Sequence, residues 1–408
     1  MTEREFATEV VSKLQRAGFT ALFAGGCVRD ELLGLIPADH DVATSAKPEE
    51  VQGLFRRTHT FGASFGVVEV LGPKDANGEW LKVQVATFRS DGTYTDGRRP
   101  DSVTFSSPEE DAARRDFTIN GLFQDPISGT VYDHVGGQAD LKAGVLRAIG
   151  NAEERFTEDK LRILRAVRMA ARFELTIDPA TFAAAKRMAS EIQAVSAERI
   201  AEELRKILTN RHRERGVRLL AEIGLVEHIL PTVNRDPDEW ERTCVALGRL
   251  PPHASFELAF ALLFRKAGPG SVGSISRKLR LSNDEWNRVS WLWVHNECPF
   301  SRDEPNSTLY PLLAHPAIHE LIALHRAEGT DPAVLDHLDG LLLDNPPETF
   351  NPPRLITGDD LKAMGLKPGP RFKALIDEVR ALQLDGHLKT RREAEEKIRE
   401  RVGLSQQE

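Results

Sequence analysis

The stretch Gly25-Gly26-Cys27-Val28-Arg29-Asp30, followed closely by Asp39-His40-Asp41, decides the fold of this chain. The apolar run Thr20–Ala24 precedes it and predicts a buried strand that ends at the two glycines. Backbone N–H groups of Gly25 and Gly26 can approach an anion closely, as in a triphosphate site. Arg29 adds a guanidinium fork that fits phosphate oxygens. A simple turn, with Arg29 paired to Asp30, is the alternative interpretation.

Asp39 and Asp41 are two residues apart, so on a strand both carboxylates point to the same face. Hard oxygen ligands in this arrangement suit one or two Mg²⁺ ions. The pattern therefore allows a Mg²⁺ site with Asp39 and Asp41 as metal ligands, and the resemblance described below implies that these two residues are catalytic. Taken alone, an Asp-x-Asp pattern also fits a solvated loop.

Further out, the chain changes character near residue 150. Before it, we expect a mixed arrangement of a helix near Pro48–Phe55 and strands at Asp41–Ala43, Gly66–Leu71, Leu81–Phe88 and Val145–Ile149. After it, long amphipathic segments predict helices and no strands. The clearest of these segments are Glu158–Phe173, Pro179–Ile192 and Ala197–Thr209. The fold class is therefore α+β, with a mixed-sheet head followed by an all-α region.

Proline and polar residues predict breaks in the helical region, notably at Pro231–Pro237 and Asn345–Pro353. The second of these is the best candidate for a linker. We expect four parts, which are a catalytic head at residues 1–150, a helical neck at 151–212, a helical body at 213–345 and a helical tail at 346–408.

Composition excludes some classes of protein. Apolar residues make up 40% of the chain, and no apolar run is long enough to cross a bilayer. The N-terminus lacks the pattern of a secretion signal, so we expect a cytoplasmic protein with no membrane partner. The three cysteines form no CxxC pair and are expected to be ordinary thiols. The sequence does not decide whether the chain forms oligomers.

The ordered motifs resemble one family. Glycine turn, short helix and Asp-x-Asp strand form the layout of the nucleotidyltransferase fold shared with DNA polymerase β. Three more motifs follow in order, at Arg114–Asn120, Glu158–Arg165 and Glu198–Leu204. Together they resemble class II tRNA nucleotidyltransferases (CCA-adding enzymes) and bacterial poly(A) polymerases. The resemblance is strong over residues 20–210 and weak over Ile356–Ala394.

This resemblance implies an enzyme that adds CMP and AMP to the 3′ end of tRNA without a nucleic-acid template. CTP and ATP would be the substrates and pyrophosphate the leaving group, with two metal ions at Asp39 and Asp41. In the family the segment containing Arg114, Asp116 and Asn120 contacts the phosphates and ribose. The alternative is that these are only charged and polar residues at the N-terminus of a helix, with no role in binding.

Asp159, Arg162 and Arg165 lie in the motif that selects the nucleotide in the family. On one helix, Asp159 and Arg162 would be neighbours three residues apart, offering a carboxylate and a guanidinium to the Watson–Crick edge of a base. UTP and GTP would leave buried groups unpaired. An ordinary surface ion pair is the alternative.

The net charge of −8 indicates that tRNA binds along a restricted basic face rather than to the whole surface. Solvated helix faces are the alternative for these basic clusters. The candidate RNA-binding residues are Arg205, Lys206, Arg211, Arg213, Lys389, Arg391 and Arg392.

Two features bear on the product. The family usually has an acidic residue where this chain has Gln84, and Glu69 is a weak candidate for its substitute. The polar stretch Arg89–Pro100 is similar to a flexible loop of full CCA-adding members, although it also fits a long surface hairpin. A poly(A) polymerase, a CC-only or A-only enzyme, and a non-catalytic RNA-binding protein remain alternatives. Transfer to a small molecule is disfavoured by the long helical region.

Overall fold

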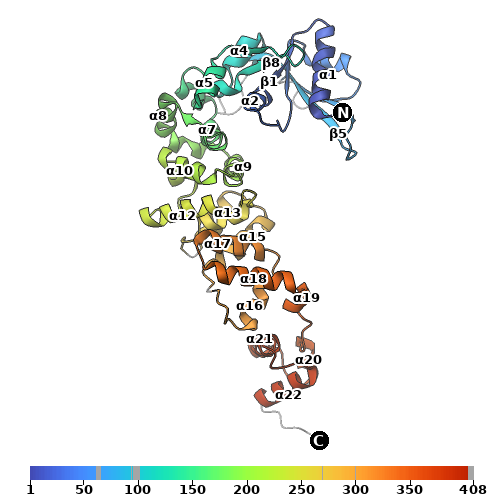
Figure 1. The fold of residues 1–408 in the computed structure, drawn as a ribbon, viewed down its shortest axis with the longest axis vertical. Coiled ribbons are helices and arrows are strands. Elements are labelled where there is room, and N and C mark those ends of the chain that lie inside the picture. The colour runs from blue at the N-terminus through green and yellow to red at the C-terminus, as the bar shows by residue number, and fades with distance from the viewer. Residues whose placement is uncertain (61–65, 93, 95–101, 269, 299, 403–408) are drawn as a thin grey trace. The chain divides into compact units, whose positions relative to one another are not determined.

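The structure is a computed structural model that describes residues 1–60, 66–92, 94, 102–268, 270–298 and 300–402. These residues form two compact units, whose elements are labelled in Figure 1. The first unit contains Met1–Pro231 and Arg277–Arg280, and the second contains Thr232–Ser276 and the described residues from Leu281 onward. The boundary at Pro231 coincides with a predicted break. The four-part division stays a prediction.

A seven-stranded mixed sheet forms the centre of the first unit, in the order β3-β4-β5-β2-β1-β8-β9. Strand β2 runs parallel to β5, and the other neighbouring pairs are antiparallel. Two small sheets pair β6 with β7 and β10 with β11. The strands are β1 (Ala21–Ala24), β2 (Val42–Thr44), β3 (Thr58–Thr60), β4 (Val67–Lys74), β5 (Trp80–Thr87), β6 (Arg89–Asp91), β7 (Val103–Phe105), β8 (Leu122–Gln124), β9 (Val131–Asp133), β10 (Val145–Leu146) and β11 (Thr176–Ile177).

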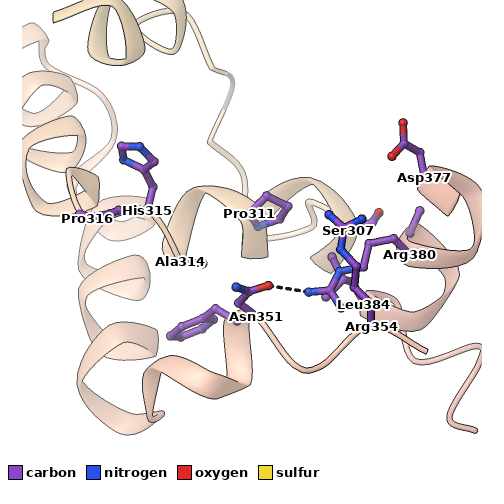
Figure 2. Close-up of a pocket in the computed structure, with 12 residues that line it drawn as sticks. Ser307, Pro311, Ala314, His315, Pro316, Asn351, Arg354, Asp377, Arg380 and Leu384 are labelled. Atoms are coloured by element: carbon purple, nitrogen blue, oxygen red, sulfur yellow. Dashed lines mark hydrogen bonds between the residues drawn. The ribbon is translucent and has the colours of Figure 1, made fainter. Parts of the chain in front are cut away.

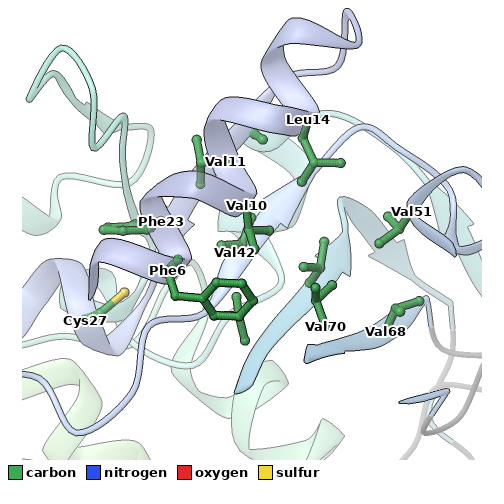
Figure 3. Packing of buried hydrophobic residues seen from close by; sticks show 14 of the residues in the cluster. Phe6, Val10, Val11, Leu14, Phe23, Cys27, Val42, Val51, Val68 and Val70 are labelled. Atoms are coloured by element: carbon green, nitrogen blue, oxygen red, sulfur yellow. The ribbon is translucent and has the colours of Figure 1, made fainter. Parts of the chain in front are cut away.

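Helix α1 (Glu3–Arg16) packs its apolar stripe on this sheet. A capping box starts it, in which Thr2 Oγ1 accepts from the N–H of Glu5 and the Glu5 carboxylate accepts from the N–H of Thr2. Phe6, Val10 and Leu14 recur at helical spacing and are buried. Figure 3 shows them against valines of the central strands. This core fixes the sheet on which the site is built.

Ten further α-helices and two 3-10 turns complete the described part of the first unit up to Pro231. Helix α10 packs against α7 and α9. The helices are α2 (Gly26–Leu32), α3 (Pro48–Leu54), α4 (Pro108–Ala113), α5 (Gly137–Ala143), α6 (Ala152–Glu158), α7 (Leu161–Arg172), α8 (Pro179–Arg187), α9 (Ala197–Leu208), α10 (Arg213–Ile223) and α11 (Val226–Ile229), with 3-10 turns at Thr118–Asn120 and Ala189–Ala194.

From Thr232 onward, the described residues contain helices and no strand. The helices are α12 (Pro237–Arg249), α13 (Phe256–Leu263), α14 (Ser271–Lys278), α15 (Asn283–Val294), α16 (Asn306–Leu313), α17 (Ile318–Glu328), α18 (Pro332–Asp344), α19 (Pro347–Phe350), α20 (Gly358–Ala363), α21 (Pro370–Leu384) and α22 (Arg391–Val402). The predicted mixed-sheet head followed by a mostly helical region is confirmed.

Two predictions about strands need correction. The expected strand Val145–Ile149 is shorter, and its residues Val145 and Leu146 pair with Thr176 and Ile177. A strand therefore does occur after residue 151. The segment Thr176–Ile177 is too short for its alternation to be recognised, and only its pairing with β10 makes it a strand.

The helix expected over Glu158–Phe173 is also wrong at its start. Helix α6 ends at Glu158, Asp159 has an extended backbone, and α7 begins at Leu161. The Asp159 carboxylate accepts from the N–H of Leu161, a local bond that competes with continuation of the helix. Asp159 thus stands at a break between two helices.

The expected linker Asn345–Pro353 is largely exposed, with one short helix and one buried side chain. It contains α19, and Phe350 at its end is buried, with its ring edge-on to Tyr310 at a centroid distance of 5.3 Å. A buried aromatic ring outweighs the turn-forming composition around it.

No described helix is long and apolar enough to cross a membrane.

Candidate nucleotide-transfer site

The glycine turn lies at the end of the central strand β1. Gly25 has φ +73° and ψ −118°, a backbone conformation that glycine adopts without strain. Its N–H donates to the carbonyl of Leu122, and the N–H of Ala24 donates to the carbonyl of Asp41, both at 2.9 Å. The turn and Asp41 therefore meet at the same edge of the sheet.

Asp39 and Asp41 lie just before β2 rather than within it. Both are exposed, whereas His40 between them is buried and its N–H donates to Glu3 Oε1 at 2.9 Å. The alternation of exposed and buried residues places the two aspartates on one side of the extended backbone. Two carboxylates thus face the same solvent-accessible region beside the glycine turn.

The two carboxylates interact electrostatically. Surrounding protein atoms partly desolvate Asp41, although its side chain keeps solvent access, and the charge of Asp39 adds to this effect. Together they raise the pKa of Asp41 to about 6, while Arg115 counteracts them. Crowded negative charge of this kind is relieved by a bound divalent cation, so the pair fits Mg²⁺ chemically.

Gln84, on the neighbouring strand β5, lies at the position next to Asp41. Val42 pairs with Val85, so the parallel register places Gln84 beside Asp41. Glu69 pairs with Gln84 across β4 and β5, and its carboxylate lies 3.4 Å from His59 Nδ1. Within the described ranges no group of three or more His, Cys, Asp or Glu residues is arranged to hold a metal ion. The donor set at this edge is therefore two carboxylates and an amide.

Four residues predicted to bind nucleotide form one buried network. Arg29 donates through Nε to Asp30 at 2.8 Å and through Nη1 to Asn120 Oδ1 at 2.5 Å. Asn120 donates to Asp116 Oδ1 at 3.0 Å, and Asp116 Oδ2 lies 2.6 Å from Arg165 Nη2. The Arg29–Asp30 pair that the sequence left as an alternative is present. The network joins α2, the 3-10 turn at Thr118–Asn120 and α7.

Asp116 is ionised within this network. Burial opposes its ionisation, but Arg165 and the donated hydrogen bond of Asn120 outweigh burial and hold the pKa of Asp116 below its usual value. The N–H of Phe117 donates to the same carboxylate at 2.9 Å. Since the side chain of Arg165 is partly exposed, the network reaches the surface there.

Arg114 and Arg115 share Asp111 as a partner, but their guanidinium groups contact different segments. Arg114 binds Asp111 at 2.7 Å and the carbonyl of Arg89, so it ties α4 to the hairpin β6–β7. Arg115 binds the other oxygen of Asp111 at 3.0 Å and donates to the carbonyl of Asn120. A Cβ atom on Gly25 would lie 2.6 Å from Arg115 Nη1.

Arg115 is therefore the cation next to the glycine turn and Asp41, a residue that our candidate set omitted. The adjacent Arg-Arg pair was the only available signal, and it does not reveal which arginine faces the turn. Asp111 was also missed. It is buried and holds both guanidinium groups.

Asp159 and Arg162 have separate partners. Arg199 Nη2 lies 2.7 Å from Asp159 Oδ2, and Arg199 Nη1 donates to Asp159 Oδ1 at 3.1 Å. Arg162 Nη1 lies 2.5 Å from Glu158 Oε2 and also donates to the carbonyl of Arg155. The predicted placement on one helix face is wrong, because the break at Asp159 changes the direction of its side chain. Both residues remain half-buried beside the first turn of α7.

The predicted RNA-binding residues fall into three groups. The prediction that Arg213 binds RNA is wrong, since its side chain is fully buried and its Nε donates to the carbonyl of Leu208 at 2.8 Å. Lys206, Arg391 and Arg392 are paired with nearby carboxylates. Arg211 and Lys389 are exposed and Arg205 is half-buried.

The polar stretch Arg89–Pro100 begins as a hairpin, with Arg89 paired with Phe105 and Asp91 with Val103. Tyr94 donates to Asp91 at 2.6 Å. Residues 93 and 95–101 lie outside the described part, so the predicted loop stays a prediction.

Comparisons with known proteins identify the family of this chain. The family model "Poly A polymerase head domain" matches residues 21–147, and "Probable RNA and SrmB- binding site of polymerase A" matches residues 174–236. The chain is 33% identical over 397 residues to the CCA-adding enzyme of Streptococcus suis, which covers 96% of this chain and 95% of that protein. It is 44% identical over 227 residues to the CCA-adding enzyme of Levilactobacillus brevis. This match covers 55% of each chain.

A solved structure is similar over the whole length. The Bacillus stearothermophilus CCA-adding enzyme in complex with CTP matches with a TM-score of 0.80 and 26% identity, covering 99% of this chain and 100% of that chain. The chain therefore belongs to the nucleotidyltransferase family of CCA-adding enzymes and poly(A) polymerases.

Proposed function

We propose that this protein is a CCA-adding enzyme, which extends the 3′ end of tRNA with CMP and AMP taken from CTP and ATP. The observation that carries the proposal is the pair Asp39 and Asp41 beside the glycine turn, in a chain with full-length CCA-adding relatives. Each addition joins the 3′-hydroxyl oxygen of tRNA to the α-phosphorus and breaks the bond to the departing pyrophosphate. We expect the protein to act in the cytoplasm.

Asp39 and Asp41 would hold Mg²⁺. Bound Mg²⁺ supplies activation of the 3′-hydroxyl and neutralisation of the phosphates. The two carboxylates suit this task because both are exposed on one side, and because partial desolvation and the charge of Asp39 already raise the pKa of Asp41. Mg²⁺ commonly retains waters and takes substrate phosphate oxygens as its other ligands, so two protein carboxylates are sufficient.

The residues around the glycine turn would bind the triphosphate. Gly25 forms the turn, Gly26 offers its backbone N–H at the start of α2, and Arg115 adds positive charge next to them. Arg29 sits one turn further along α2 with its guanidinium already bound to Asp30 and Asn120. We assign Arg29 a supporting role, which keeps the turn and the Asp116 segment in register. Asp116 and Asn120 would face the ribose.

Asp159 and Arg162 would read the base. Arg162 retains N–H groups beyond its bond to Glu158, and Asp159 presents its carboxylate at the helix break. A carboxylate and a guanidinium at the base edge favour cytosine and adenine over uracil and guanine, because the latter leave buried groups unpaired. Arg205 and Arg211 on and beside α9 would contact the tRNA backbone.

The test is incorporation of labelled CTP, ATP, UTP and GTP into tRNA that lacks its last three nucleotides, with product lengths resolved on a gel. We expect growth by three nucleotides that needs CTP and then ATP. Asp39→Asn should abolish it, while Glu49→Gln, which removes an exposed carboxylate on α3, should not. A long A ladder, or a stop after CC or A alone, would contradict the proposal.

A further inference from the structure

A hollow lies in the second unit, where the expected linker packs against two helices (Figure 2). Its volume is about 400 Å³. Pro311, Ala314 and His315 on and after α16 form one wall, and Ala381 and Leu384 of α21 form another. Phe350 and Asn351, from the segment after α18, close it. None of the candidate nucleotide-transfer residues belongs to this hollow.

Two arginines line the hollow without a carboxylate partner. Arg380 donates to three neutral acceptors, which are the carbonyl of Pro352 at 2.7 Å, Asn351 Oδ1 at 2.8 Å and Gln383 Oε1 at 3.0 Å. Arg354 is exposed and has no hydrogen bond or ion pair among the described residues. Burial and the charge of Arg354 both lower the pKa of Arg380. Neither guanidinium group at the hollow therefore pairs with a carboxylate among the described residues.

Some other arginines in the same unit are paired with carboxylates. Arg265 binds Glu239 and Glu328, and Arg288 binds Glu320. Asp377 also lines the hollow, but within the described part of the chain it forms no ion pair, and Figure 2 shows its carboxylate turned away from both arginines. In a chain of net charge −8, two unbalanced guanidinium groups at one cavity indicate an anionic ligand.

We propose that this hollow, defined by Arg354 and Arg380, binds a phosphate group of the tRNA backbone. Two guanidinium forks match phosphate oxygens, and Ser307 on the same wall can add a hydroxyl donor. A cavity of about 400 Å³ accommodates a phosphate with part of its ribose. The nucleotide-transfer residues all belong to the first unit, and none of them lines this hollow. This inference rests on the proposed function, because it assigns the tRNA a contact with the second unit.

The test compares Arg354→Gln with Lys373→Gln by fluorescence anisotropy of labelled tRNA lacking CCA, over a range of KCl concentrations. Each variant removes one exposed positive charge from the same part of the chain, but Lys373 on α21 lies outside the hollow. We expect Arg354→Gln to weaken binding roughly tenfold and to flatten the slope of log K against log salt by about one unit. Lys373→Gln should change affinity less than about twofold.

A second variant, Arg380→Gln, should weaken tRNA binding in the same way, after its thermal unfolding is shown to match the wild type. The maximal rate of CMP addition at saturating tRNA should be unchanged in Lys373→Gln, because that residue lies outside the hollow. Equal affinities and slopes for Arg354→Gln and Lys373→Gln would overturn the inference.

A free anion, rather than tRNA, would give a different result. If Arg354→Gln loses binding of inorganic phosphate, measured by calorimetry, but binds tRNA like the wild type, the hollow holds a free anion and the tRNA assignment is wrong. If the wild type adds no nucleotide to tRNA at all, the proposed function fails. If the wild type adds CCA normally while the arginine variants bind like the control, only the phosphate site fails.

Discussion

Arg199 holds both carboxylate oxygens of Asp159, at 2.7 Å through Nη2 and 3.1 Å through Nη1. Arg199 lies on α9 and Asp159 at the break before α7, so the pair joins two motifs that are 40 residues apart. A two-point ion pair fixes the orientation of a carboxylate, which a single contact does not. Arg199 is thus placed to position the residue that would read the base.

We predict that Arg199→Gln lowers kcat/KM for CTP about tenfold and raises the share of UTP misincorporated, because the Asp159 carboxylate loses its fixed direction. Arg199→Lys should recover only part of the loss, since an ammonium lacks the planar fork. Steady-state kinetics with each nucleotide provide the measurement. Arg187→Gln, which breaks a surface pair with Glu153, is the matched control. An unchanged CTP to UTP ratio in Arg199→Gln would refute the positioning role.

The pKa of Asp41, raised to about 6, predicts how Mg²⁺ activation depends on pH. Protons compete with the metal below this value, so the Mg²⁺ concentration for half-maximal activity should increase as pH falls from 7 to 5. Titration of activity with Mg²⁺ at each pH provides the measurement. A half-maximal concentration that does not vary across this range would contradict the prediction.

The same raised pKa affects stability without metal. Between its unfolded pKa near 4 and its folded pKa of about 6, the folded state holds more protons at Asp41, so stability falls as pH rises through this window. Asp41→Asn should therefore raise the unfolding temperature in EDTA at pH 8. Near pH 3.5 it should have a smaller effect, because Asp41 is mostly protonated there in both states. Thermal unfolding at the two pH values tests this.

Gln84 lies beside Asp41 in the parallel register of β2 and β5, so Gln84→Glu adds a third carboxylate to the same edge. We expect the variant to need several-fold less Mg²⁺ for half-maximal activity, because carboxylates increase the negative charge available to the cation. Gln84→Ala, which adds no charge, should leave the Mg²⁺ requirement nearly unchanged. Equal Mg²⁺ requirements for the Glu and Ala variants would exclude a role for this position in metal binding.

Arg29 is the hub of the buried network, since it pairs with Asp30 and Asn120 and its guanidinium lies 4.3 Å from the ring centre of Phe173. Arg29→Met should lower the free energy of unfolding by about 3 kcal/mol, because Asp30 loses its close partner while remaining buried. Urea denaturation measures this loss. Arg187→Met, at an exposed pair, should change stability by less than about 1 kcal/mol. Similar losses in the free energy of unfolding for both variants would show that the buried network stabilises the fold no more than a surface ion pair does.

Several features followed from local sequence alone. The buried strand before Gly25 and the helix expected over Ala197–Thr209 are properties of neighbouring residues, and the structure confirms them. The ordered motifs identified the family, which the full-length relatives confirm. The predicted roles of the individual site residues stay predictions.

The tertiary structure decided which groups meet. Asp159 pairs with Arg199 rather than Arg162, Arg115 rather than Arg114 lies against Gly25, and Arg213 is buried. The proline-rich segment expected to be a linker closes a cavity. Each of these outcomes depends on contacts between residues distant in the chain. Periodicity and motif spacing report only on near neighbours, so they fix which chemical groups are available, and the packing of helices and strands fixes their partners.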